Sequence, residues 1–66
     1  MEEYKIYSKD ENLILIIKSL MNEKVDFEFK HGIMSDNYIV FKSYNSEAGM
    51  REIINEIIDN SDFTIK

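Results

Sequence analysis

Two runs of β-forming residues separated by a polar bend constrain the fold of this chain more than any other feature. In residues 25–30, apolar and charged residues alternate, which places the apolar ones on one face of a strand. Residues 37–43 are rich in β-branched and aromatic side chains, and Gly32 in the intervening bend can adopt unusual backbone angles. The two runs predict an antiparallel hairpin. An isolated hairpin is marginally stable in water, so the rest of the chain must cover one face.

The alternation also predicts which hairpin residues face the core. In the first run these are Val25, Phe27 and Phe29. In the second run, Ile39 and Phe41 are assigned to the core because Lys42 then faces solvent.

The segment before the hairpin predicts a strand followed by a helix. Residues 4–7 alternate as a short strand, and Ser8 with Glu11 three residues later matches a capping box, so Ser8 is the expected N-cap. The predicted helix covers residues 9–23. Its apolar stripe at i, i+3, i+4, i+7 and i+8 consists of Leu13, Ile16, Ile17, Leu20 and Met21. The competing interpretation is a strand through residues 13–17, because that run is apolar throughout.

The segment after the hairpin repeats this arrangement in the opposite order. Asn45 or Ser46 is the expected N-cap of a helix over residues 46–60. Its stripe consists of Met50, Ile53, Ile54, Ile57 and Ile58. Residues 62–66 alternate again and predict a last short strand, in which Phe63 and Ile65 face the core.

The predicted order is strand, helix, strand, strand, helix, strand. Right-handed crossovers place both helices on one face of a four-stranded antiparallel sheet in strand order 4-1-3-2. This is a ferredoxin-like α+β sandwich, and residues 1–66 are expected to form a single small domain.

The composition argues against most kinds of catalytic and metal-binding site. The chain has no cysteine and a single histidine, His31, and its two glycines are isolated, so thiol nucleophiles, zinc sites and phosphate loops are not expected. His31 could be drawn into a dyad with Ser35, but no third residue would orient it, and an exposed turn histidine is the simpler interpretation. We therefore expect a non-enzymatic protein with no metal and no cofactor.

The charge and the apolar runs indicate which environments suit the chain. A net charge of -5 disfavours nucleic acid and anionic membranes, and no apolar run is long enough to span a bilayer. The first residues lack the pattern of a signal peptide, so a cytoplasmic location is expected.

One candidate binding surface is acidic and lies on the second predicted helix. Glu52, Glu56 and Asp59 fall opposite the isoleucine stripe, where Glu52 and Glu56 repel each other and Asp59 opposes the helix dipole. No basic residue offsets these effects, which favours a basic protein partner. The alternative is an ordinary solvated helix face.

A second candidate surface is the uncovered face of the sheet. Tyr7, Tyr38 and Val40 are expected to lie outward on the two central strands. Aromatic residues at these places resemble the base-stacking face of RNA-recognition folds, although residues 37–41 lack the Lys/Arg-Gly-aromatic core of that motif. The alternatives are that Tyr7 and Tyr38 only pack across strands, or that the face binds a protein or a second copy of the chain.

Regulatory ACT domains are similar in element order and length, and they bind amino acids at dimer interfaces. Their usual glycine after the first strand is replaced here by residues 8–10, Ser-Lys-Asp. The resemblance implies a ligand-binding regulatory dimer.

Two apolar features remain outside these surfaces. Leu15 is expected on the solvent side of the first helix. Ile33 and Met34 in the bend are expected either to fold back over the end of the core or to contact a partner. Together the features predict a small acidic protein-interaction module, an inhibitor, adaptor or regulator, with ligand or single-stranded nucleic-acid binding as the alternative.

Overall fold

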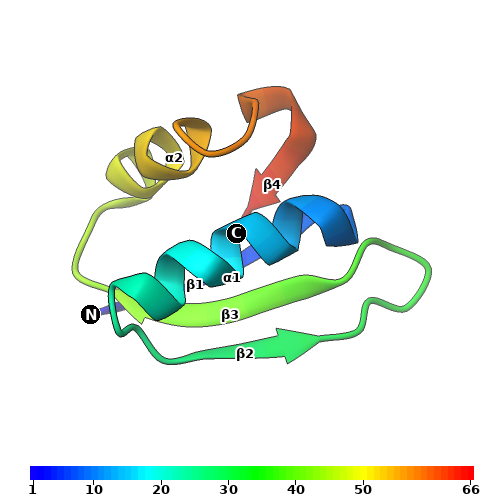
Figure 1. Cartoon of the computed structure of the whole chain (residues 1–66), viewed down its shortest axis with the longest axis horizontal. Helices are drawn as coiled ribbons and strands as arrows, with labels where there is room; N and C mark the ends of the chain where they lie inside the picture. Colours follow the sequence, from blue (N-terminus) through cyan, green and yellow to red (C-terminus); the bar gives the residue numbers. More distant parts are fainter.

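The computed structural model describes residues 1–66 (Figure 1). Its elements are β1 (Glu2–Ser8), α1 (Asp10–Asn22), β2 (Phe27–Lys30), β3 (Tyr38–Ser43), α2 (Glu47–Asn55), the short 3-10 helix η1 (Asn60–Asp62) and β4 (Phe63–Ile65). The strands form one antiparallel sheet in the order β2-β3-β1-β4. The predicted ferredoxin-like α+β fold is confirmed, including its strand order. Neither α-helix combines the length and the apolar content that crossing a membrane requires.

One apolar core joins the sheet to both helices. The register pairs Ile6 with Ile39 and Tyr4 with Phe41 on the central strands, so alternate residues of both strands face the helices. The core residues are Tyr4, Ile6, Leu13, Ile16, Leu20, Ile39, Phe41, Met50, Ile54, Ile58, Phe63 and Ile65. Among the strands, only β1 and β3 supply fully buried side chains, Ile6 and Ser8 from β1 and Ile39 from β3, so the core is centred on these two strands.

The helical interpretation of the first apolar run is confirmed, and the alternative strand through residues 13–17 is not formed. Leu13, Ile16 and Leu20 are buried in α1, and Ile17 is partly buried. Met21 was predicted to complete the stripe, but its side chain is 64% exposed. The reason is geometric: α1 meets the sheet along a narrower strip than its apolar residues span. Leu15 is exposed, as expected.

The predicted cap of α1 is wrong. The N-cap position is Lys9, which makes no side-chain hydrogen bond, and Ser8 is the last residue of β1. The buried Ser8 hydroxyl donates to the Asp62 carbonyl at 2.6 Å and accepts from Asn12 Nδ2 at 3.0 Å. Ser8 therefore links β1, α1 and the approach to β4. β1 extends through Ser8, the residue that the capping-box motif predicts as the helix cap.

The second helix begins as predicted but is shorter than predicted. Ser46 is its N-cap, and the Ser46 hydroxyl accepts a hydrogen bond from the Gly49 N–H at 3.1 Å. The helix ends at Asn55 rather than near residue 60. Ile58 lies beyond the helix yet is buried, because the following turn and η1 bring the chain back over the sheet toward β4.

The first hairpin strand is also shorter than predicted. β2 begins at Phe27, because Lys24 has φ 59° and the Val25 N–H donates to the Leu20 carbonyl, which extends the end of α1. Val25 and Phe27 are partly buried against the core. Phe29 was predicted to be a core residue and is 42% exposed. It faces the helix side of the sheet, opposite Ile39, but β2 is an edge strand and nothing covers its outer flank.

The hairpin bend projects into solvent. Ile33 and Met34 are fully exposed, so the expectation that they fold back over the core is wrong. The bend is held at its base instead, where the Gly32 N–H donates to Asn37 Oδ1 and Asn37 Nδ2 donates to Asp10 Oδ1. A Cβ on Gly32 would lie 2.2 Å from the Asp36 carbonyl oxygen, so the close approach requires glycine.

Candidate functional site: a groove between the two helices

Five of the six predicted site residues lie on two separate surfaces. Tyr7, Tyr38 and Val40 are together on the bare face of the sheet, as the strand register requires. Glu52 and Glu56 are exposed on the helix side of the molecule. The predicted residues on the sheet therefore lie on a different side of the molecule from Glu52 and Glu56.

Tyr7 on the bare face has both faces of its ring covered. The Tyr7 and Tyr38 rings stack with centroids 4.5 Å apart and an interplanar angle of 26°. Lys66 Nζ lies 5.0 Å from the centroid of the Tyr7 ring. Because β3 and β4 flank β1 on opposite sides, these two contacts cover opposite faces of the ring. A nucleic-acid base needs a free ring face for stacking, so Tyr7 fits the cross-strand packing alternative better than base recognition.

The charge on the bare face is unlike that of the whole chain. Its outward positions carry four lysines and two glutamates: Lys5, Lys30, Lys42, Lys66, Glu3 and Glu28. Lys30 and Glu28 form an ion pair at 2.9 Å, and this hydrogen bond raises the pKa of Lys30. Since the chain has thirteen acidic residues, most of the negative charge lies on the helix side and in the connections.

The predicted acidic face does not include Asp59. Because α2 ends at Asn55, Asp59 lies outside the helix and is the N-cap of η1. Its carboxylate accepts hydrogen bonds from the Ser61 N–H and hydroxyl, each at 3.1 Å, and these bonds lower the pKa of Asp59. Only Glu52 and Glu56 remain as neighbours one turn apart on α2.

A groove lies between α1 and α2 on the helix side of the molecule. It has a cavity volume of ≈ 510 Å³ and extends from the two helices to the end of β3. Its apolar lining consists of Leu20, Val25, Phe41, Met50, Ile53 and Ile57, and its polar lining of Ser19, Glu23, Lys42, Ser43, Asn45 and Glu56. We call this surface the inter-helix groove.

The two helices each contribute a carboxylate to the groove from their C-terminal caps. Glu23 is the C-cap of α1 and Glu56 is the C-cap of α2, and neither helix has a basic residue in its last turn. The C-terminal end of a helix carries partial negative charge, so both carboxylates add to an unfavourable field. Neither Glu23 nor Glu56 makes an ion pair, and Lys42 is the only basic residue in the lining.

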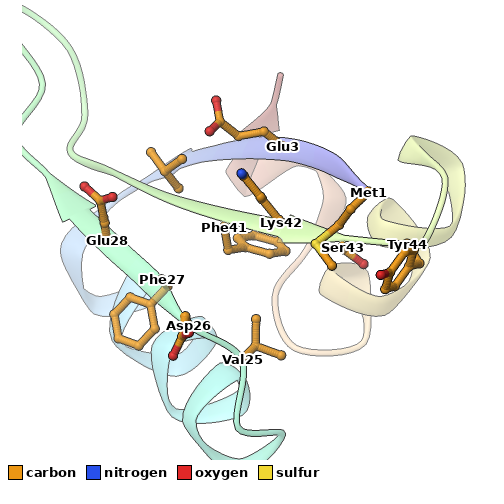
Figure 2. Close-up of a pocket in the computed structure, with 11 residues that line it drawn as sticks. Met1, Glu3, Val25, Asp26, Phe27, Glu28, Phe41, Lys42, Ser43 and Tyr44 are labelled. Carbon is orange, nitrogen blue, oxygen red and sulfur yellow. The ribbon is translucent and has the colours of Figure 1, made fainter.

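A second hollow adjoins the groove where β2 separates from β3. It measures ≈ 570 Å³, and it shares Val25, Phe41, Lys42 and Ser43 with the inter-helix groove. Figure 2 shows Val25 and Phe41 facing each other across the opening between the start of β2 and the end of β3. The apolar surface of the groove therefore continues around the end of the sheet.

The sequence predicted the character of some residues that line the groove, but it did not predict the groove itself. Leu20, Phe41, Met50 and Ile57 were predicted as core residues, and Glu56 as an exposed acid. Glu23 was missed, although the absence of a basic residue in the last turn of α1 was readable. That these residues share one hollow depends on the space between the helices, which no local pattern encodes. No group of three histidine, cysteine, aspartate or glutamate side chains is placed to hold a metal ion.

No protein-family model matches this chain, and neither does any curated protein or solved structure. The function is therefore inferred from the geometry and charge of the molecule.

Proposed function

We propose that this protein is a non-enzymatic interaction module that binds a basic, partly apolar segment of a partner protein in the inter-helix groove. The observation that carries the proposal is the pairing of an apolar floor with two carboxylates that make no ion pair, Glu23 and Glu56. The occupant that complements this surface has apolar side chains on one side and lysine or arginine beside them.

The apolar floor supplies the gain from burial. Ile53 is 43% exposed in the groove although it belongs to the apolar stripe of α2, and Val25 and Ile57 are only partly buried. Covering such surface is favourable by about 25 cal/mol for each Å² of apolar area removed from water. An amphipathic helix or an extended segment with spaced apolar residues can provide that cover.

The carboxylates supply the selectivity. Glu52 lies one turn before Glu56, so the like charges on α2 repel each other and add to the field of the helix C-terminus. A cationic side chain near Glu23 and Glu56 relieves both effects. An acidic segment of the same shape meets repulsion instead, so the groove discriminates by charge.

The test uses two peptides and two pairs of protein variants. The probe is a short amphipathic helical peptide with leucine at i, i+3, i+4 and i+7 and lysine elsewhere, and its control replaces every lysine with glutamate. Binding is followed by backbone amide NMR shifts and by calorimetry. We expect the lysine peptide alone to bind and to shift the signals of Leu20, Ile53 and Ile57.

The variants assign the binding to the groove. The double variant Glu23→Lys and Glu56→Lys is expected to bind the lysine peptide roughly tenfold more weakly, or less tightly still. A tenfold loss of affinity is equivalent to about 1.4 kcal/mol. The control variant Glu11→Lys and Asp36→Lys makes the same charge change at exposed positions outside the groove. It is expected to bind the lysine peptide more tightly than the groove variant does. An equal loss of peptide affinity in both double variants, or NMR shifts confined to Tyr7 and Tyr38, would overturn the proposal.

A further inference from the structure

The flank of α1 that faces away from the inter-helix groove continues into an uncovered strand edge. Ile14 is 52% exposed and Met21 is 64% exposed, and their spacing places them on one side of α1 together with the partly buried Ile17. Asp10 lies one turn before Ile14 and accepts a hydrogen bond from Asn37 in the β2–β3 connection, so this flank faces β2. Figure 1 shows β2 as the free lower edge of the sheet, with α2 on the other side of α1.

The β2 edge has the features of a strand that can be paired. Its sequence, Phe-Glu-Phe-Lys, contains no proline, and no other strand or helix lies beyond it. Phe27 and Phe29 point to the helix side, whereas Glu28 and Lys30 point to the bare side. An unpaired edge exposes backbone donors and acceptors that another strand can use.

The alternation of charge on β2 makes the strand complementary to itself. If two copies pair antiparallel around a two-fold axis perpendicular to the sheet, one residue must lie opposite its own equivalent. An axis at Glu28 places glutamate opposite glutamate, and an axis at Lys30 places lysine opposite lysine. An axis at Phe29 places Glu28 opposite Lys30 of the second copy, and Lys30 opposite Glu28.

We propose that two copies of this chain associate through β2, antiparallel and centred on Phe29, so that their sheets join into one. The two Phe29 rings then meet on the helix side of the joined sheet. The exposed flanks of α1, with Ile14 and Met21, approach each other above them. On the bare side, the Glu28–Lys30 ion pair of each copy becomes part of a group of four alternating charges.

Charge exchange on β2 tests this register directly. The association of the full chain is measured by analytical ultracentrifugation over a wide range of protein concentration. Glu28→Lys places lysines opposite lysines, and Lys30→Glu places glutamates opposite glutamates, so each single variant is expected to weaken dimerisation by at least about tenfold. The double variant with both exchanges restores opposite charges and is expected to dimerise like the original chain.

Mixing the two single variants gives a second prediction. The Glu28→Lys chain presents two lysines, and the Lys30→Glu chain presents two glutamates, so the mixture is expected to form heterodimers although each chain alone dimerises only weakly. The matched control exchanges Glu3 and Lys42, which are paired on the central strands of the same face, and it is expected to leave dimerisation unchanged. Circular dichroism checks that each variant is folded.

Three results would overturn the proposal: a wild-type chain that stays monomeric at every concentration, a dimer that survives both single exchanges, or a double variant that fails to restore it. A dimer disrupted by the Glu3 and Lys42 exchange would instead place the contact on the bare face of the sheet. These outcomes are distinguishable from those of the groove test, because Glu28 and Lys30 do not line the inter-helix groove; only the control exchange touches it, at Lys42.

Discussion

The two α-helices each begin beside a serine, but the two serines make different contacts. Ser46 stands directly before α2 and accepts a hydrogen bond from Gly49 in the first turn of its own helix. Ser8 lies in β1, and its buried hydroxyl joins the Asp62 carbonyl to the Asn12 side chain. The start of α2 is therefore stabilised locally, whereas the start of α1 is held by a contact between distant parts of the chain.

The apolar stripes of the two helices show the same difference between pattern and packing. Each stripe has five members, and in each only three are buried: Leu13, Ile16 and Leu20 in the first, and Met50, Ile54 and Ile58 in the second. The remaining members lie at the sides of the helix–sheet contact. Ile53 and Ile57 line the inter-helix groove, and Met21 lies on the flank beside β2. The residues that complete the pattern without entering the core mark the two proposed binding surfaces.

The largest expected effect on stability distinguishes buried from exposed members of the apolar stripe of α1. Leu13→Ala removes a fully buried side chain from α1 and is expected to lower the free energy of unfolding by about 2–5 kcal/mol. Met21→Ala, one of the same predicted stripe, is expected to change it by less than about 0.5 kcal/mol because its side chain is exposed. Urea denaturation followed by circular dichroism measures both.

Ile16→Val provides a milder variant if Leu13→Ala does not fold, with an expected loss of about 0.5–1.5 kcal/mol. Similar losses for Leu13→Ala and Met21→Ala would mean that α1 packs through its whole stripe, contrary to the structure.

The next effect compares the two serines. Ser8→Ala removes a buried hydroxyl that donates to the Asp62 carbonyl, so the free energy of unfolding is expected to fall by about 1–3 kcal/mol. Ser46→Ala removes only the local cap and is expected to lower the free energy of unfolding by about 1 kcal/mol. Ser46→Asp keeps a cap acceptor and is expected to restore most of that loss, as thermal or urea unfolding would show. If Ser8→Ala were the milder variant, the contact between β1 and Asp62 would not be what holds the start of α1.

The smallest effect concerns the start of η1 and depends on pH. The hydrogen bonds from Ser61 lower the pKa of Asp59 below that of the unfolded chain, so ionised Asp59 stabilises the fold. That contribution is present above the unfolded pKa of about 3.9 and is lost as the pH falls through the lower pKa of the folded state. Asp59→Asn keeps an acceptor without the charge and is expected to flatten this acid loss.

The measurement is a series of urea denaturation curves from neutral pH down to strongly acidic pH, for the original chain and for Asp59→Asn. Glu11→Gln, which removes an exposed charge elsewhere, is the matched control. Parallel pH profiles for the original chain and Asp59→Asn would show that the ionisation of Asp59 does not contribute to stability.

Where the sequence prediction failed, a residue beyond the local window decided the outcome. Ser8 matched a capping box with Glu11, but pairing of β1 with β4 extended the strand through Ser8 and gave its hydroxyl to Asp62. Asp59 matched a helix C-terminus, but the chain left the helix at Asn55 so that Ile58 and Phe63 could reach the core. Phe29 matched a core position by its alternation, but the edge position of β2 left it partly uncovered.

The sequence by itself determined the order of the elements, the faces of the strands and the fold class, because periods of 2 and 3.6 residues assign each side chain to a face of its own element. It also determined that Tyr7, Tyr38 and Val40 share one surface, since strand alternation and topology require it. Only the tertiary structure decided which apolar residues the core covers, where Asp59 lies, and that Glu23 and Glu56 border one groove. Those outcomes depend on the spacing between elements, which is set by the packing of the whole chain rather than by the sequence of any one segment.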